Sequence, residues 1–217
     1  MRLSLKEAEF FSSIKAGDVN AVKLALQSEP YLVEYQDEIG STPLHLAVEN
    51  VSIEMVELLV SMGAKVEIID GEGRTPLHVA IGKCLESYSI ERDKFIQIAT
   101  ILLQSGADVN SLDKSLLSSL HHAAILGDRE IVTFLVKNGA NINLRGAKGF
   151  TPLHWALCAN IETRDIQKHL DVIEALINFG ADVTAKTQSG ETPLVVSNRY
   201  NPGRSQLLQL LKNFGAV

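Results

Sequence analysis

Apolar side chains recur at helical spacing along most of this chain. Ile53, Val56 and Leu59 form one such run, and Ile131, Phe134 and Leu135 form another. Spacings of three and four residues place these side chains on one face of a helix. The runs end just before Gly-Ala pairs, and glycine is favoured in the left-handed position that closes a helix. These pairs begin at Gly63, Gly106, Gly139, Gly180 and Gly215. The pattern predicts short amphipathic helices that end at glycine.

A second marker predicts where other helices begin. The tetrapeptide Thr-Pro-Leu-His occupies residues 42–45, 75–78 and 151–154, with degenerate copies at 118–121 and 192–195. Proline is tolerated in the first helical turn, and a preceding threonine can cap that turn. The interval from each of the first four glycines to the next tetrapeptide is constant, whereas the interval from tetrapeptide to glycine varies between copies. The variation in length is therefore expected inside the helical part.

Five copies with a period of about 33 residues indicate an array of repeats and not a single closed core. The Thr-Pro-Leu-His signature and the period resemble the ankyrin-repeat family, and the resemblance covers nearly the whole chain. It implies an all-α solenoid in which each repeat is a β-turn finger followed by two antiparallel helices.

The markers divide the chain into repeats of one domain, residues 1–217. We expect a degenerate capping repeat at 4–36, full repeats at 37–69, 70–112, 113–145 and 146–186, and a C-terminal capping repeat at 187–217. The first of these has the turn Ala16-Gly17-Asp18 but Pro30 in place of the closing glycine. In the last, Lys212 stands where the other repeats have Val60, Leu103, Val136 and Ile177. A charge there suits a face that meets water, and capped ends favour a monomer.

Composition narrows the possible partners. The chain is 46% hydrophobic, which supports a folded core, and its net charge of -6 argues against a surface built to bind nucleic acid or anionic membrane. Cys84 and Cys158 make no disulfide framework, which is typical of a reducing compartment. No apolar stretch has the length of a signal peptide core or a membrane span. We expect a cytoplasmic protein.

The family resemblance implies that partners are held by the finger tips and the exposed side of the first helix of each repeat. The candidate partner-binding residues are Glu38, Ile39, Ser41, Glu49, Asn50, Glu72, Arg74, Lys83, Lys114, Ser115, Leu117, Ile125, Leu126, Lys148, Phe150, Gln188, Glu191, Arg199 and Tyr200. Among them Leu117, Ile125, Leu126 and Phe150 are expected to form an exposed apolar centre with a polar rim, the usual composition of a protein interface. The alternative is that some of them pack inside the array, because Leu116 replaces the usual finger glycine.

Two repeats carry insertions between their helices. The repeats at 70–112 and 146–186 are longer than those at 37–69 and 113–145, and the additional length falls within the segments Gly82–Arg92 and Asn160–Arg164. These connections could form a second binding surface, or they could be length variation in tolerant loops.

The recurring histidines do not indicate a metal site. The resemblance implies that His45, His78, His121 and His154 bond to the backbone of the neighbouring finger, and the stacking distance between repeats is too long for one metal ion to bridge. We found no catalytic or cofactor motif in the sequence. We therefore expect a non-catalytic protein-binding scaffold without cofactors. An inhibitor, or a secreted bacterial effector that captures a host protein, would use the same surface, so these functions stay open as alternatives. An enzyme is a further alternative.

Overall fold

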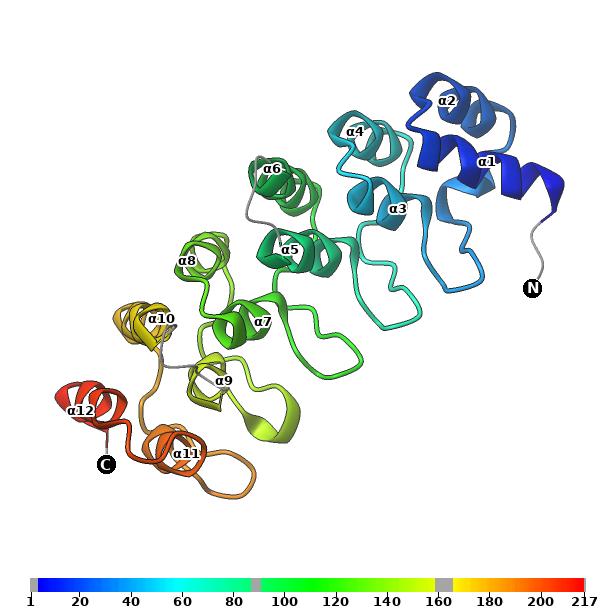
Figure 1. Ribbon diagram of the computed structural model, residues 1–217. Coiled ribbons are helices and arrows are strands. Elements are labelled where there is room, and N and C mark those ends of the chain that lie inside the picture. Colours follow the sequence, from blue (N-terminus) through cyan, green and yellow to red (C-terminus); the bar gives the residue numbers. More distant parts are fainter. Residues whose placement is uncertain (1–3, 87–90, 159–165, 217) are drawn as a thin grey trace. The chain divides into compact units, whose positions relative to one another are not determined.

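The computed structural model describes residues 4–86, 91–158 and 166–216. Within these residues the regular structure is entirely helical, with twelve α-helices and two short 3-10 helices (Figure 1). This confirms the all-α prediction. The chain groups into two compact units, residues Met1–Asp108 and Val109–Val217. The boundary falls inside the predicted repeat at 70–112, after its second helix.

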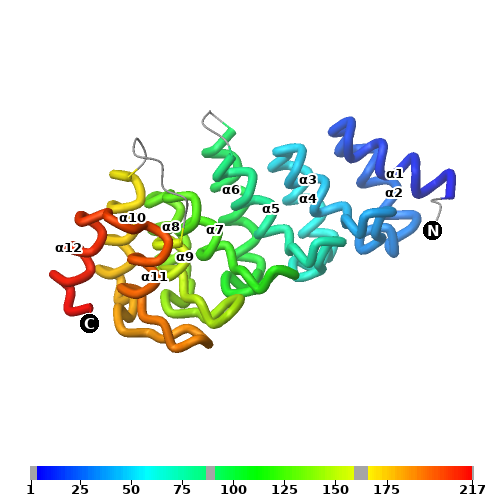
Figure 2. The backbone as a smooth tube through the Cα atoms, turned by 60° about the horizontal axis from the view of Figure 1, so that its bottom comes forward, coloured from blue at the N-terminus to red at the C-terminus, as the bar shows by residue number. Residues whose placement is uncertain are grey.

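The first unit contains three helix pairs. Its elements are α1 (Leu5–Ala16), α2 (Val19–Ser28), η1 (Pro30–Glu34), α3 (Pro43–Glu49), α4 (Ile53–Ser61), α5 (Pro76–Glu86) and α6 (Glu91–Gln104). Helices α1, α3 and α5 pack in one row, and α2, α4 and α6 pack in a second row beside it (Figures 1 and 2). Below we call these the inner and outer helices. Fingers connect each outer helix to the next inner helix.

The second unit repeats this arrangement. Its elements are α7 (Ser119–Leu126), α8 (Arg129–Lys137), η2 (Ala147–Gly149), α9 (Pro152–Cys158), α10 (Ile166–Asn178), α11 (Pro193–Tyr200) and α12 (Ser205–Asn213). The inner helices are α7, α9 and α11, and the outer helices are α8, α10 and α12. Fully buried side chains such as Leu120, Ile131 and Leu135 fill the space between the two rows.

The local signals for helix ends are confirmed. Pro43 is the first residue of α3, and the Thr42 hydroxyl accepts a hydrogen bond from the His45 N–H at 3.4 Å. The glycines of the five Gly-Ala pairs that follow outer helices all have left-handed backbone, with φ between 86° and 94°. Sequence therefore specifies both the start of the inner helices and the end of the outer helices.

Features predicted for the two ends of the chain are also present in the structure. Ser4 caps α1 in a reciprocal capping box with Glu7, and the predicted turn at Gly17 leads into α2. Near the other end Lys212 is exposed, whereas Val60, Leu103, Val136 and Ile177 at the equivalent position are half-buried. The positively charged side chain of Lys212 thus lies at a position that is exposed in the last helix pair and half-buried in the others.

Part of the first insertion is helical. Helix α5 has 11 residues against 7 in α3, and α6 has 14 against 9 in α4. Most of Gly82–Arg92 therefore extends these two helices, and only residues 87–90 lie outside the described residues. Asn160–Arg164 also lies outside them. In the part of the chain that the structure describes, no helix has the length and apolar character to span a membrane.

Candidate interaction surface

Each finger is a tight turn closed by a pair of backbone atoms. The N–H of its first residue donates to the carbonyl of its fifth residue at 2.8–3.0 Å. These pairs are Asp37 with Ser41, Asp70 with Arg74, Asp113 with Leu117, Gly146 with Phe150 and Thr187 with Glu191. The fifth residue therefore lies at the base of the finger, and the second and third residues form its tip.

Neighbouring fingers within a unit approach closely through their backbones. In the first unit the Gly71 N–H donates to the Ile39 carbonyl at 3.0 Å. A Cβ atom at Gly71 would lie 2.3 Å from that oxygen, so only glycine allows this approach. In the second unit Ala147 donates to Leu116 at 3.1 Å and Gln188 donates to Lys148 at 2.9 Å. These contacts hold the tips in fixed register.

Two histidines of the repeat signature, His45 and His121, each join an inner helix to the finger that follows it. The Nδ1 atom of His45 accepts from the Thr42 N–H at 3.2 Å, which leaves the proton on Nε2, 2.9 Å from the Arg74 carbonyl. His121 repeats the arrangement, with Nε2 lying 3.1 Å from the Leu144 carbonyl and 3.3 Å from the Phe150 carbonyl. Burial lowers the pKa of His121 to about 4, and the carbonyl contacts oppose this only in part. These imidazoles are neutral structural groups at pH 7.

The candidate residues fall into three groups by exposure. The exposed ones are Glu38, Ile39, Asn50, Glu72, Lys114, Ser115, Leu126, Lys148, Gln188, Arg199 and Tyr200. The half-buried ones are Glu49, Arg74, Lys83, Ile125 and Glu191. The buried ones are Ser41, Leu117 and Phe150. The first eight in sequence order, Glu38 to Lys83, belong to the first unit and the other eleven to the second.

The prediction that Leu117 and Phe150 are exposed is wrong. Both are fifth residues at the base of a finger, with exposed fractions of 8% and 6%. The Phe150 ring lies 5.4 Å from the His154 ring and 5.3 Å from the Trp155 ring, measured between centroids. Ser41 is buried for the same reason, since it holds the fifth position of the first finger. These three side chains support the fingers from inside the unit.

Several charged candidates already pair within the chain. Arg74 bonds to Asp70 at 2.8 Å and to Glu72 at 3.2 Å. Arg199 bonds to Glu191 at 2.6 Å, and Lys83 lies 3.5 Å from Glu86. Although burial by itself opposes ionisation, hydrogen bonds from Arg74 and from the Glu72 N–H together lower the pKa of Asp70. A partner charge at these positions competes with an existing ion pair.

Sequence reasoning missed three side chains on the inner-helix side of the second unit. Leu116 is 54% exposed at the turn of its finger, and Val195 is 47% exposed on α11. Val195 replaces the signature histidine, and that substitution was the available signal. Trp155 of α9 is half-exposed and its ring lies against that of Phe150, so it contributes to both packing and surface.

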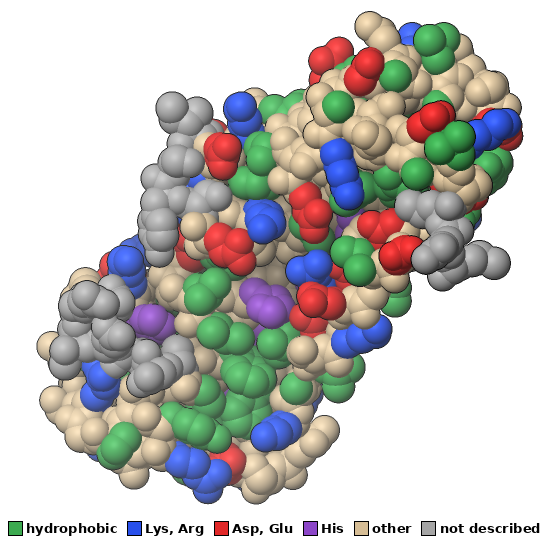
Figure 3. All heavy atoms as spheres, turned by 45° about the vertical axis from the view of Figure 1, so that its right-hand side comes forward, with side chains coloured by type: hydrophobic (Ala, Val, Ile, Leu, Met, Phe, Trp, Pro, Cys, Tyr) green, Lys and Arg blue, Asp and Glu red, His purple; other side chains and the backbone are tan. Residues whose placement is uncertain are grey.

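These side chains define an apolar surface on the second unit. Leu116, Leu126, Trp155, Val195 and Tyr200 come from a finger and from helices α7, α9 and α11, and we call them the second-unit apolar surface. Figure 3 shows hydrophobic side chains gathered on this side of the unit. The finger tips of the same unit carry two exposed basic residues, Lys114 and Lys148.

The finger tips of the two units differ in charge. Residues 1–108 carry 9 Lys and Arg against 17 Asp and Glu, a net charge of -8, whereas residues 109–217 carry 11 against 9, a net charge of +2. The exposed tips follow this division, with Glu38 and Glu72 in the first unit and Lys114 and Lys148 in the second. The acidic character of the chain is therefore concentrated in its first half.

Paired helices, regular fingers and a histidine that links one repeat to the next define a tandem-repeat protein of the kind that binds other proteins. The family model described as ankyrin repeats (3 copies) matches residues 10–90 and 87–187. The chain belongs to the ankyrin-repeat family, and its fold is the all-α ankyrin array predicted from the sequence.

Curated relatives match this chain over only part of their own length. The chain is 34% identical to human ankyrin repeat and SOCS box protein 16 over 179 residues, which cover 82% of this chain and 37% of that protein. It is 27% identical to palmitoyltransferase AKR1 of Lachancea kluyveri over 164 residues, 76% of this chain and 20% of that protein. The chain thus spans well under half the length of these two relatives.

Solved structures also match nearly the whole length of this chain. An ankyrin repeat domain from Acinetobacter baumannii AYE superimposes with a TM-score of 0.79 at 25% identity, covering 97% of this chain and all of that one. Ankyrin repeats are general protein-interaction modules, and these similarities identify no particular partner.

Proposed function

We propose that this chain is a non-catalytic scaffold that binds a partner protein through its finger tips and inner helices. The second-unit apolar surface carries the proposal. Leu126 and Tyr200 are 55% and 50% exposed, although both are large apolar side chains at the ends of inner helices. Clustered exposed apolar groups with a charged rim are typical of protein interfaces, and aromatic side chains contribute much of their affinity.

In the first unit the proposed contacts are mainly polar. Glu38, Glu72 and Asn50 are exposed, and Ile39 at a finger tip is 70% exposed. Charged contacts at the edge of an interface mainly affect the association rate and the choice of partner. We propose that this unit adds selectivity for a partner with positive charge opposite these tips.

The proposed partner is a protein and not nucleic acid, because the overall charge is negative and the fingers of the first unit are acidic. The non-catalytic role is supported by His45 and His121, which are buried and neutral in the described part of the inner helices. We further propose that the chain works as a monomer in the cytoplasm.

The test compares two immobilised proteins, the wild type and a triple variant that carries Leu126→Ser, Val195→Ser and Tyr200→Ser. Each is used to capture binding proteins from a lysate of the source cell. Phe179→Ser is the control, because it removes a 39% exposed apolar side chain from the end of outer helix α10. We expect specific proteins to bind the wild type and the control and to be lost from the triple variant. Equal retention on all three proteins would refute the proposed surface, provided that circular dichroism shows each to be folded.

A further inference from the structure

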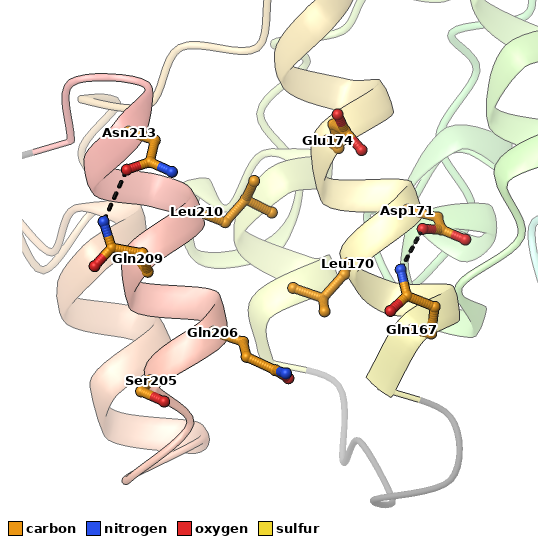
Figure 4. Close-up of a pocket in the computed structure, with 9 residues that line it drawn as sticks. All are labelled: Gln167, Leu170, Asp171, Glu174, Ser205, Gln206, Gln209, Leu210 and Asn213. Carbon is orange, nitrogen blue, oxygen red and sulfur yellow. Dashed lines mark hydrogen bonds between the residues drawn. The ribbon is translucent and has the colours of Figure 1, made fainter.

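A groove lies between the outer helices α10 and α12 of the second unit (Figure 4). These two helices lie on the other side of the inner helices from the fingers (Figure 1). Its volume is about 560 Å³, and it is open to solvent. The described residues that line it all belong to these two helices. None of the residues of the second-unit apolar surface contributes to it.

The floor of the groove is apolar. Leu170 of α10 and Leu210 of α12 point toward each other across it and are both half-buried (Figure 4). The amides of Gln206 and Gln209 belong to the α12 wall, and both side chains are exposed. An amide can both donate to and accept from a peptide backbone. The groove therefore offers an aliphatic contact beside hydrogen-bonding groups.

The rim of the groove is negative. Asp171 and Glu174 lie three residues apart on α10, so they share one face of the helix. The Gln167 amide donates to one Asp171 oxygen at 2.7 Å, which fixes that carboxylate and leaves its other oxygen available. None of the nine described side chains that line the groove is positively charged. Two carboxylates without a lining cation attract a cationic group.

The equivalent groove in the first unit differs in these respects. Between α4 and α6 the volume is about 310 Å³, and the lining includes Ile53, Ile96 and Ile101 with a single carboxylate, Glu57. Of these two grooves between outer helices, the one between α10 and α12 is the larger and carries two carboxylates. It also has four glutamine and asparagine amides in its lining, against one in the smaller groove.

We propose that the groove between α10 and α12 binds a short basic peptide segment of a partner protein. An aliphatic side chain of the segment packs between Leu170 and Leu210, and an Arg or Lys pairs with Asp171 and Glu174. Arginine suits the rim because its fork of donors matches carboxylates and its aliphatic stem can lie on apolar surface. Helix α12 has nine residues, so the groove extends for about 13 Å, the length of roughly four extended residues.

The experiment uses the full chain and a library of acetylated, amidated ten-residue peptides. Their five central positions are drawn from Leu, Arg, Glu and Gln. The test variant is Asp171→Asn, Glu174→Gln, which keeps the shape of the groove and removes its charge. Glu57→Gln is the control, since it removes a carboxylate from the smaller groove. We expect the wild type and the control to select peptides that contain both Leu and Arg, with about tenfold weaker binding to the double variant.

Methyl NMR spectra locate the selected peptide. The Leu170 and Leu210 methyl signals should shift on titration, and a peptide with Gln in place of Arg should shift them less. Selection of Glu-rich peptides, equal binding to the double variant, or shifts confined to other methyl groups would each overturn the proposal, as would a library from which no peptide is selected. The finger-side variants of the proposed function leave this groove intact, so the two hypotheses fail independently.

Discussion

The Nε2 atom of His121 lies 3.1 Å from the carbonyl oxygen of Leu144, and the pKa of this histidine falls to about 4. The cause is burial, since the side chain is completely inaccessible to solvent. Its Nδ1 atom accepts from the Ser118 N–H at 3.1 Å, which fixes the neutral tautomer. The burial of this histidine therefore makes the stability of the second unit depend on pH.

We predict that the second unit loses stability as the pH falls from about 6.5 to about 4. In this window the unfolded chain, whose histidine pKa is about 6.5, binds a proton that folded His121 does not bind. The stabilisation is fully present above pH 6.5 and declines below it. For His121 alone the loss reaches about 3 kcal/mol at the lower end, from about 1.4 kcal/mol per pKa unit.

Urea unfolding at pH 7.5, 6 and 5 measures this effect. His121→Asn is expected to be less stable at pH 7.5 but to lose less stability on acidification. His45 and His154, whose pKa values burial also lowers, contribute in the same direction and remain in the variant. An unchanged dependence on pH in the variant would show that other groups cause it.

A second prediction concerns the backbone of Val51, which joins α3 to α4. Its φ of 55° is left-handed, whereas the equivalent turns use Gly17, Gly127 and Gly203 with φ between 71° and 79°. A β-branched residue in this conformation costs on the order of 1–3 kcal/mol. We expect Val51→Gly to raise the free energy of unfolding by about 1 kcal/mol, after the greater entropy of glycine in the unfolded chain is included.

Val51→Ala is the matched control for this change. It removes the branched side chain but keeps a Cβ atom in the left-handed conformation, so we expect a smaller gain than with glycine. Chemical denaturation of the three proteins compares them. Equal stabilisation by Ala and Gly would assign the effect to the side chain and not to the backbone.

The sequence predicts elements best where one local interaction determines the structure. Pro43 begins α3 and Gly63 ends the helix pair because their backbone requirements are local. The structural role of the signature histidines followed from the family pattern, and the contacts of His45 with the Arg74 carbonyl and of His121 with the Phe150 carbonyl confirm it for these two residues.

The candidate surface was harder to predict because exposure depends on the shape of the finger. Leu117 and Phe150 are buried because the fifth finger residue lies at the base, where the chain turns back on itself. Leu116 and Val195 each replace a residue of the usual pattern, and they are 54% and 47% exposed. The groove between α10 and α12 arises from two helices that a finger and α11 separate in sequence, so no local pattern indicates it.

A third prediction contrasts two glycines of the first unit. At Gly71 an added Cβ would meet the Ile39 carbonyl at 2.3 Å, so Gly71→Ala must separate two fingers and weaken their hydrogen bond. We expect a loss of about 1–3 kcal/mol in the free energy of unfolding. At Gly82, inside helix α5, no atom lies within 4 Å of an added Cβ.

Gly82→Ala should therefore stabilise the unit by about 0.5–1 kcal/mol, because alanine is the better helix former. Thermal unfolding followed by circular dichroism gives both values. The opposite signs make the pair informative, and a stabilising Gly71→Ala would contradict the close approach of the two fingers.

The last prediction concerns the two cysteines. Burial, followed by the nearby negative charge of Glu191, raises the pKa of the half-buried Cys158 thiol to about 12. Only about one such thiol in ten thousand is ionised at pH 8, and the thiolate is the reactive form. Cys84 is fully buried. We therefore expect both thiols of the folded protein to react with Ellman's reagent at pH 8 far more slowly than free cysteine. Urea should restore fast reaction of two thiols per chain, and Cys84→Ser and Cys158→Ser variants assign the residual rate in the native state. Rapid native reaction that Cys158→Ser abolishes would show that this thiol is ionised much more readily than its surroundings indicate.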